Sequence, residues 1–449
     1  MPVTTPFAAF REDLQARLLA AYPDHLARAS WNRERLRAHQ AGALRALLAH
    51  AAEHSPFHAR RLAGIDLDAV HPDDPSALPV MTKSDVIADF DGIVTDRRLT
   101  RALVEETLAA TGAEPRPILG EYLAFVSGGS SGQRGVFVHD LDGQLQFVAS
   151  VSRGLVARIS AMGGPPPGGL PVAIVAAGSA VHPTGAPAAL TANGALPFRY
   201  LPVPATLPTA EIVARLNELA APVLYGYPSM LARLAAEPGL RISPVLVSCT
   251  GEALTPALRS AIRDGFGVPV VDGFACTEGL VGSTAPDGDV HVLAEDGCIV
   301  ELVDTERRPV PPGEQASAVL ITVLHNRVQP LIRYELPDAF VAVGEAPLRV
   351  RIAGRSDAPF RYPDALVHPH VLRTVLLRAP EVREYRVVQT VRGVAVEVVV
   401  DGPVPELATG LGAALADAGL ARPEVTVAVV AGLDRDRRSG KLRRFVPLG

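Results

Sequence analysis

APVLYGYPSMLARLAAEPGLRISPVLVSCTGEAL, residues 221–254, holds two short apolar segments rich in valine and leucine, each followed by a loop. A helical pattern, LARLAA, lies between them. LPVAIVAAG (170–178) and the helical patterns TAEIVARLNELA (209–220) and TPALRSAIRDGF (255–266) continue the alternation on either side. Alternating buried strands and helices predict an α/β fold with a mostly parallel sheet and helices on both faces.

The rest of the chain divides around this α/β core. Residues 8–64 are typical of helices, because Leu, Ala and His recur at three- and four-residue spacing. Residues 289–336 are β-rich, which predicts a small antiparallel sheet or barrel attached to the core. The turn-rich stretch GRSDAPFRYPD (354–364) is the best domain boundary. We therefore expect a large domain over residues 1–354 and a small α+β domain over residues 355–449.

Composition and charge exclude several classes of protein. Hydrophobic residues make up 48% of the 449 residues and charged residues 20%, which is typical of a globular chain. The net charge of −5 provides no global basic field, so we expect neither a nucleic acid nor a membrane as a partner. The apolar run Leu170–Ala177 is too short to span a bilayer, and the charged N-terminus lacks a secretory signal.

The cysteines indicate the compartment. Cys249, Cys276 and Cys298 show neither the paired spacing of a zinc site nor the density of a disulfide scaffold. A reducing cytoplasm is therefore the expected location, and an enzyme that acts on small molecules is the expected class.

A glycine- and serine-rich loop, VSGGSSGQRG (126–135), follows an apolar strand and is a candidate phosphate site. Its glycines let backbone amides approach an anion, its hydroxyls are further donors, and Arg134 adds positive charge. The loop lacks the GK[ST] ending of a Walker motif. Alone, it is equally well interpreted as a flexible turn.

A second motif, GFACTEG (273–279), follows the short apolar strand VPVV. Phe274 offers a flat face for a base, Thr277 a hydroxyl for a phosphoryl oxygen, and Glu278 a carboxylate for Mg²⁺. The simpler interpretation of these residues is an ordinary turn with a surface glutamate.

Three further residues have side chains suited to a nucleotide. Asp338 offers a carboxylate to ribose hydroxyls, and Arg355 a guanidinium to the ribose or a phosphate. Lys441 follows Ser-Gly near the C-terminus and could place a point charge on a reacting phosphate. Only Lys83 and Lys441 are lysines among 43 basic residues, so each marks a place where arginine did not replace lysine. For Asp338 and Arg355 the alternative interpretation is a salt bridge at the rim of the domain, and for Lys441 it is a solvated basic tail.

In this order and spacing, the motifs resemble those of the adenylate-forming superfamily of acyl-CoA synthetases, luciferases and adenylation domains. SGGSSGQRG is similar to the family's phosphate loop, FACTE to its Tyr-Gly-x-Thr-Glu, and SGK to its C-terminal Gly-Lys. RYELPD and GRSDA resemble its Tyr-Arg-Thr-Gly-Asp and Gly-Arg-x-Asp-Asp. The segments LPVMTKSDV, YGYPSML, SCTGEAL and VHVLAEDGCIVELVD resemble the phenylacetate–CoA ligase-like branch.

The resemblance implies a reaction in two halves. A carboxylate attacks the α-phosphorus of ATP, with Mg²⁺ as cofactor, and gives acyl-AMP and pyrophosphate. A nucleophile, often the thiol of coenzyme A, then displaces AMP. Residues 1–354 would form the nucleotide-binding catalytic domain and residues 355–449 a mobile lid, in a monomer or a homodimer.

The resemblance also implies a role for each motif residue. The β- and γ-phosphates would be held by Ser127, Gly129, Ser130, Ser131 and Gly132. Arg134 would replace the charge of the family's lysine, because Gln133 stands at that position. The adenine and ribose would be bordered by Gly251, Glu252, Ala253, Phe274 and Asp338, with Arg355 nearby.

The reacting groups follow from the same resemblance. Thr277 would touch the α-phosphate, and Glu278 would bind Mg²⁺. Lys441 would bridge the carboxylate and the phosphate during adenylation. Asp357 matches the hinge about which the lid rotates between the two half-reactions.

The sequence leaves the acid and the acceptor open. Phe137, Tyr225, Tyr227 and Ser229 would suit a flat, apolar pocket for an aromatic acid, and ordinary core packing is the other interpretation of each. The glycine that the family uses near the pantetheine tunnel is missing from residues 358–363. The acceptor is therefore coenzyme A, a carrier-protein thiol, an amine or another small nucleophile.

Two further hypotheses are weaker. His291 and Cys298 suggest a zinc site, but two candidate ligands without a second pair make a poor one. A non-catalytic relative that binds a nucleotide as a scaffold is the rival to an enzyme, and the retained Lys441 argues against it.

Overall fold

The computed structural model describes most of the chain. The described residues are 6–127, 135–176, 180–181, 186–345, 347–355, 360–363, 365–367, 371–372, 375–376, 379, 381–435 and 442–448. None of the helices among them is long and apolar enough to cross a membrane.

The N-terminal region is helical, as predicted. α1 (Pro6–Arg28), α2 (Arg33–His54) and α3 (Pro56–Leu62) follow one another with short breaks. Ser55 ends α2 and also begins α3, where its hydroxyl accepts a hydrogen bond from the His58 N–H at 3.2 Å. Pro56 stands at the first turn of α3, where its missing N–H has no cost.

A large mixed sheet forms the core. Within the described residues it has nine strands in the order β13-β14-β9-β8-β7-β6-β5-β3-β4. Their bounds are β3 Leu170–Ala176, β4 Phe198–Pro204, β5 Val223–Gly226, β6 Leu246–Thr250, β7 Val270–Ala275, β8 Val281–Thr284, β9 His291–Leu293, β13 Asp338–Glu345 and β14 Leu348–Arg355. The strands β3 to β7 pair in parallel, which confirms the predicted alternation, whereas β8, β9, β14 and β13 pair antiparallel.

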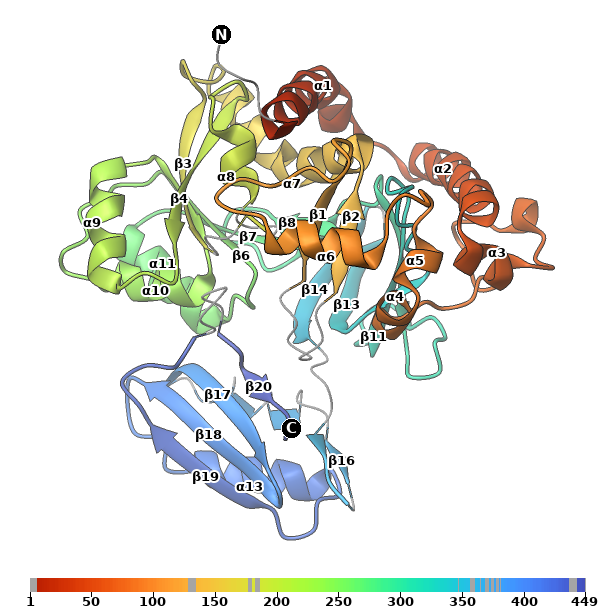
Figure 1. Ribbon diagram of the computed structural model, residues 1–449. Coiled ribbons are helices and arrows are strands. Elements are labelled where there is room, and N and C mark those ends of the chain that lie inside the picture. Colours follow the sequence, from red (N-terminus) through yellow and green to blue (C-terminus); the bar gives the residue numbers. More distant parts are fainter. Residues whose placement is uncertain are drawn as a thin grey trace.

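Helices cover both faces of this sheet (Figure 1). Successive residues of a strand point to opposite faces, so Val223 packs with α1, α7 (Leu141–Ala161) and α8 (Ala186–Thr191), while Leu224 packs with the helices opposite. Those opposite helices are α9 (Thr209–Leu219), α10 (Pro228–Ala235) and α11 (Pro256–Phe266). α1 lies along α7, and the buried hydroxyls of Tyr22 and Ser152 join the two helices at 2.9 Å.

The β-rich segment after residue 289 divides between two sheets. β10 (Cys298–Val303), β11 (Ala318–Val323) and β12 (Tyr334–Leu336) form a small antiparallel sheet in the described part of the chain, as predicted. β9, β13 and β14 instead extend the large sheet. The prediction of one separate β unit over residues 289–336 was therefore wrong for β9, because β8 turns back from β7 and presents an open edge to β9.

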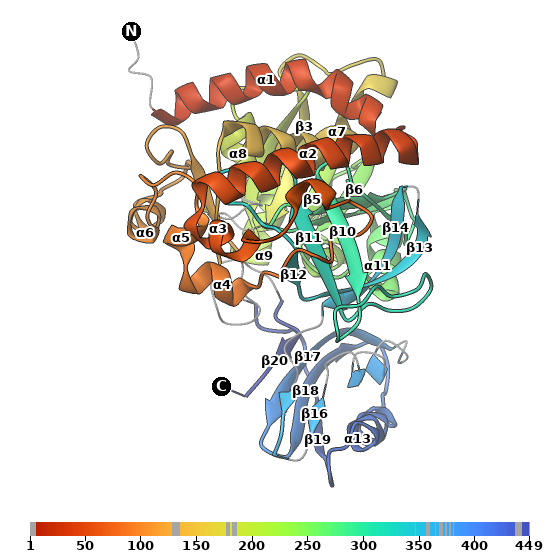
Figure 2. The same ribbon diagram turned by 90° about the vertical axis from the view of Figure 1, so that its right-hand side faces the viewer.

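The C-terminal region forms a sheet of its own beneath the large sheet (Figure 2). In the described residues its strand order is β19-β18-β17-β20, and α13 (Leu407–Asp417) packs on it. The strand bounds are β15 Phe360–Arg361, β16 Leu366–Val367, β17 Val382–Thr390, β18 Gly393–Val400, β19 Glu424–Val429 and β20 Phe445–Val446. This arrangement matches the expected α+β unit.

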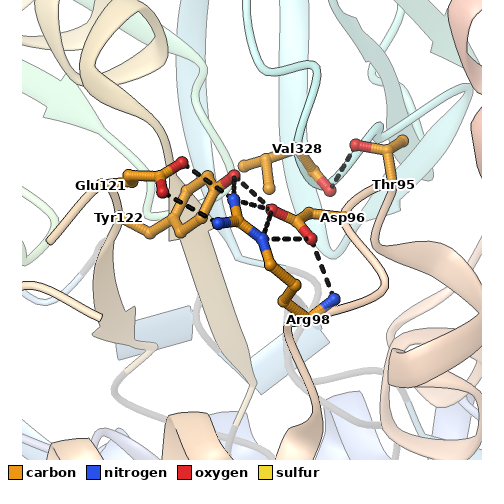
Figure 3. Close-up of polar contacts among 6 residues, drawn as sticks. All are labelled: Thr95, Asp96, Arg98, Glu121, Tyr122 and Val328. Atoms are coloured by element: carbon orange, nitrogen blue, oxygen red, sulfur yellow. Dashed lines mark hydrogen bonds and ion pairs between the residues drawn. The ribbon is translucent and has the colours of Figure 1, made fainter. Parts of the chain in front are cut away.

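The hairpin of β1 (Leu123–Val126) and β2 (Val136–His139) carries the glycine- and serine-rich loop. Short helices flank it: η1 (Leu67–Ala69), α4 (Lys83–Ala88), α5 (Phe90–Ile93) and α6 (Arg101–Ala109). A polar network fixes the start of β1 (Figure 3). There the Asp96 carboxylate accepts hydrogen bonds from the Tyr122 hydroxyl at 2.7 Å and from Arg98 Nε at 2.9 Å, and Arg98 also pairs with Glu121.

We expect Asp96→Asn to weaken this network in a pH-dependent way. Hydrogen bonds from Arg98 and Tyr122 hold the pKa of Asp96 well below its usual range, so its contribution to stability is present above about pH 4 and fades as the pH falls further. An exposed pair of this kind contributes about 0.5–1 kcal/mol, or about 1–2 °C in Tm. The difference between the thermal melts of the two proteins should be full at pH 7 and shrink progressively as the pH falls below 4; a difference that stays constant over this range would contradict the assignment.

Candidate active site

Two loops that the sequence selected lie side by side at the carboxyl edge of the parallel strands. β6 ends at Thr250, which pairs in register with Gly273 of β7. Gly251 follows with a φ of 75°, a conformation that favours glycine, and starts the loop to Ala253. Phe274 comes directly after Gly273. The structure therefore places the backbone of Phe274 beside the start of the 251–253 loop, at the edge where α/β sheets bind ligands, and its ring packs edge-on against Phe340 with centroids 5.3 Å apart.

Thr277 and Glu278 lie in a tight turn between β7 and β8. The Cys276 N–H donates to the Leu280 carbonyl at 3.0 Å, and the Gly279 N–H donates to the Cys276 carbonyl at 3.1 Å. Thr277 is 9% exposed and Glu278 is 8% exposed. The simpler interpretation, a surface glutamate on an ordinary turn, is therefore wrong for Glu278, since a carboxylate buried to this degree needs a compensating partner.

Asp338 approaches the same turn from another pair of strands. It begins β13, is 2% exposed, and lies opposite Arg355 in the register of β13 and β14. Burial raises the pKa of the Cys276 thiol well above its usual value, and the charges of Glu278 and Asp338 raise it further. Both carboxylates therefore lie near the same sulfur, and the structure brings Asp338 together with Thr277 and Glu278, which precede it by about 60 residues in the sequence.

His139 lies behind this turn and is not the surface histidine that its position after the loop suggests. It is 2% exposed in β2, and burial lowers its pKa to about 3, with His325 as the next cause. The ring is therefore neutral at physiological pH and too weakly basic to accept a proton in a reaction there.

Only the base of the predicted phosphate loop falls within the described residues. The Ser127 N–H donates to the Gly135 carbonyl at 3.0 Å, and the Gly135 N–H donates to the Ser127 hydroxyl at 3.1 Å. This pair closes the loop just beyond β1. The predicted site residues outside the described ranges are Gly129, Ser130, Ser131, Gly132, Arg134, Asp357 and Lys441.

Glu252 joins the C-terminal region to this edge, a contact that the sequence did not predict. Its carboxylate accepts a hydrogen bond from the Leu442 N–H at 2.9 Å and forms an ion pair with Arg435 at 3.4 Å. Ser229, expected in the acid pocket, donates its hydroxyl to Glu252 and accepts from Arg435 Nη1 at 2.7 Å. Arg435 also pairs with Glu384 of β17 at 3.2 Å.

This inter-sheet cluster (Ser229, Glu252, Glu384 and Arg435) is largely buried. Exposed side-chain fractions are 4% for Glu252, 13% for Arg435 and 16% for Glu384. One guanidinium therefore lies between two carboxylates that belong to different sheets. The cluster fixes the backbone of Leu442, the residue after Lys441, beside the 251–253 loop.

A cavity of about 490 Å³ opens on the face of the sheet that α7 covers. Tyr225, Ser248, Gly273, Phe274 and Val281 line it near the carboxyl edge. Its walls are mostly apolar, and its volume is within the range of small-molecule sites.

Three residues expected in the acid pocket do not line this cavity: Ser229, whose contacts are with Glu252 and Arg435, and the aromatic residues Phe137 and Tyr227. Phe137 is 1% exposed and packs edge-on against Tyr334, with ring centroids 6.3 Å apart. Tyr227 is 0% exposed and lies in the core beneath α10. Both aromatic residues are therefore packed in the core, which is the second of the two interpretations given for them.

His291 and Cys298 lie in different sheets. His291 Nε2 is 3.4 Å from Asp272 Oδ2, whereas the Cys298 thiol donates to the Gly279 carbonyl at 3.6 Å. Across the part of the chain that the structure describes, no group of three His, Cys, Asp or Glu side chains could hold a metal ion.

Solved structures share this architecture. 2-Hydroxyisobutyryl-CoA ligase, in the postadenylation state with 2-HIB-AMP, matches with a TM-score of 0.63 and 20% identity, over 91% of this chain and 88% of that chain. The chain has the fold of these acyl-CoA ligases. A benzoate CoA ligase from Burkholderia xenovorans LB400 matches the ligase fold with a TM-score of 0.51 and 22% identity, over 75% of this chain and 69% of that chain.

The sequence comparison covers a smaller part of the chain than the comparison of structures. No family model matches the chain. Chalcone synthase cfoA from Aspergillus candidus is 26% identical over 164 residues, which cover 31% of this chain and 6% of that protein. The chain therefore spans a small fraction of the length of this curated relative.

Proposed function

We propose that the chain is an ATP-dependent ligase that converts a carboxylic acid to acyl-AMP with release of pyrophosphate and then transfers the acyl group to a thiol such as coenzyme A. The observation that carries the proposal is the meeting of Thr277, Glu278 and Asp338 at the carboxyl edge of a sheet with the acyl-CoA ligase fold. The cavity beside Phe274 gives an acid a place to bind next to that edge.

The first half-reaction needs positioning and charge neutralisation more than covalent catalysis. In the proposed arrangement, Asp338 holds the ribose hydroxyls and Phe274 stacks on the adenine, which aligns the α-phosphorus with a carboxylate in the cavity. The carboxylate oxygen bonds to phosphorus as the bond to the pyrophosphate oxygen breaks. The hydroxyl of Thr277 donates to an α-phosphate oxygen, and Lys441 neutralises the charge that develops there.

Glu278 suits a hard cation, because it presents carboxylate oxygens from a turn whose backbone is fixed. Mg²⁺ held there would neutralise phosphate charge and favour departure of pyrophosphate. The burial of Glu278 supports this assignment, since an ionised carboxylate in such a position is stabilised by a cation.

The inter-sheet cluster supports a lid that closes over the nucleotide. The TM-score is 0.63 against 2-hydroxyisobutyryl-CoA ligase in its postadenylation state and 0.55 against the same protein in its thioesterification state. We infer that Arg435 stabilises the arrangement used for adenylation, because it pairs with Glu252, whose carboxylate also accepts a hydrogen bond from the Leu442 N–H.

Arg435→Ala is expected to slow adenylation at least about tenfold. Without the guanidinium, Glu252 and Glu384 are two buried carboxylates that repel each other, and removal of one partner from a buried pair costs about 3–5 kcal/mol. Pyrophosphate release measured over a range of ATP and acid should show a lower kcat. Glu384→Gln in the same variant should restore part of the rate, because it removes the repulsion.

Arg422→Ala is the matched control for this variant, since Arg422 is an exposed arginine of the same C-terminal region. It should leave the rate unchanged. An unaltered rate in Arg435→Ala would show that the cluster has no part in adenylation.

The acceptor separates the favoured reaction from its alternatives. Purified protein is incubated with ATP, Mg²⁺ and a panel of carboxylic acids, with and without coenzyme A, and the products are read by mass spectrometry. Acyl-CoA and AMP are expected together. AMP that forms only with an amine or a carrier protein would point to a different acceptor, and absence of AMP with every acid would favour a non-catalytic protein.

A further inference from the structure

The cavity is larger than a small acid requires. A cavity of about 150 Å³ holds one benzene ring, whereas this one measures about 490 Å³. A single-ring acid would therefore leave most of the cavity unfilled, and the apolar side chains that line the unfilled part would have no van der Waals contacts with the ligand.

The cavity also extends sideways across the sheet. Ala275 pairs with Val281, and the Ala294 N–H donates to the Val281 carbonyl at 2.8 Å. Ala275 and Ala294 are therefore two strand spacings apart, about 10 Å. Both line the cavity, and Asp296 lines it two residues further on. Ala275, which comes two residues before Thr277, thus lines one side of this span, and the other side lies beneath the C-terminal end of α1, where Leu26 and Arg28 line the cavity.

The far end is polar, unlike the rest of the cavity. Arg28, Trp31, Arg153 and Asp296 line it, and we call them the polar corner. Arg153 Nη1 is 2.9 Å from Asp296 Oδ1, and Arg28 Nη1 is 3.9 Å from Asp296 Oδ2. The three side chains are 16%, 15% and 5% exposed for Arg153, Arg28 and Asp296, respectively.

Hydrogen-bond donors outnumber acceptors in the polar corner. Trp31 Nε1 is buried and has no hydrogen-bond partner among the residues that the structure describes. An indole N–H and two guanidinium groups are donors only; Arg153 pairs with Asp296, and Arg28 pairs with Asp24 at 2.6 Å, which leaves the indole N–H as the donor without an acceptor within the described ranges. A ligand that fills the corner must therefore bring an acceptor, because buried donors without partners are costly.

We propose that the acid is elongated, with an apolar body about two rings long and a hydrogen-bond acceptor at the end opposite its carboxylate, held by Trp31 and Arg153. The direction in which the acid lies rests on the proposed function, which places its carboxylate beside Thr277. The length and the distal acceptor rest on the cavity alone.

Three acids test the proposal: benzoic acid, biphenyl-4-carboxylic acid and 4′-hydroxybiphenyl-4-carboxylic acid. Binding to the full chain is measured by calorimetry without ATP, and turnover by ATP–pyrophosphate exchange. We expect the hydroxylated acid to bind at least about tenfold more tightly than the unsubstituted biphenyl acid, and benzoic acid to bind most weakly.

Trp31→Phe removes the indole N–H and keeps an aromatic ring. It should reduce the preference for the hydroxylated acid to about threefold or less, with little change for biphenyl-4-carboxylic acid. Tyr200→Phe is the matched control, because Tyr200 lines the cavity from β4, away from the polar corner. Tyr200→Phe should keep the full preference for the hydroxylated acid over biphenyl-4-carboxylic acid.

The outcomes separate this proposal from the proposed function. Equal binding of benzoic acid and the biphenyl acids, or a preference that Trp31→Phe leaves intact, would overturn the elongated acid. Binding in the expected order without exchange for any acid would leave the cavity assignment standing and contradict the ligase activity.

Discussion

Lys441→Ala is expected to slow release of pyrophosphate at least about a hundredfold, the largest single effect that we predict. A positioned donor that stabilises charge only in the transition state is worth about 3–4 kcal/mol in comparable acyl transfers. Lys441 itself lies outside the described residues, but the N–H of Leu442 is hydrogen-bonded to Glu252 at 2.9 Å. The chain beside Lys441 is therefore held at the edge where Thr277 and Glu278 lie.

The second half-reaction is the control for this prediction. Thioester formation from acyl-AMP supplied in the assay should be much less affected, because the lysine is assigned to the first half-reaction alone. Lys83→Ala is the matched variant, since Lys83 is the other lysine of the chain and begins α4. Its rates should stay near those of the unaltered protein. Near-normal pyrophosphate release in Lys441→Ala would remove this residue from the mechanism.

Glu278→Gln is expected to lower kcat/KM for ATP by about a hundredfold at fixed Mg²⁺. The amide keeps the size of the side chain but loses the charge that a divalent cation requires. Removal of a charged partner from a buried, hydrogen-bonded site costs about 3 kcal/mol or more. Titration with Mg²⁺ should show a higher concentration for half-maximal rate, which a purely structural role for Glu278 would not change.

Glu306→Gln is the matched control, because the Glu306 side chain is 61% exposed and pairs with its sequence neighbours Arg308 and Thr305. It should retain the rate and the Mg²⁺ dependence. If Glu278→Gln also kept both, Glu278 would be a buried structural carboxylate and the cation would have to bind elsewhere.

The strands of the parallel core could be predicted because their pattern is local. Val223 and Leu224 are both buried, one on each face of the sheet, so the segment is apolar throughout and reads as a strand covered on both sides. The turn at Thr277 and Glu278 was selected for a different reason: in isolation its residues suit an ordinary turn, and only their order with the other motifs resembles a known superfamily. Their burial depends on the packing of β8 and β13 and was not visible in the sequence.

Contacts between distant segments could not be predicted in this way. Arg435 and Glu252 are separated by 183 residues, and Arg153 and Asp296 by 143. Each of these side chains is also common on protein surfaces, so its type alone does not indicate a buried pair. The same limit applies to Phe137 in β2 and to Tyr227 just after β5, because an apolar aromatic ring is equally suited to a core and to a pocket wall.

Acid-dependent ATP–pyrophosphate exchange tests the proposed activity most directly, because it follows the first half-reaction without any assumption about the acceptor. The account predicts exchange that requires both Mg²⁺ and an acid that binds the cavity, is lost in Lys441→Ala and persists in Lys83→Ala. An acid that demonstrably binds the cavity while labelled pyrophosphate never enters ATP would contradict it.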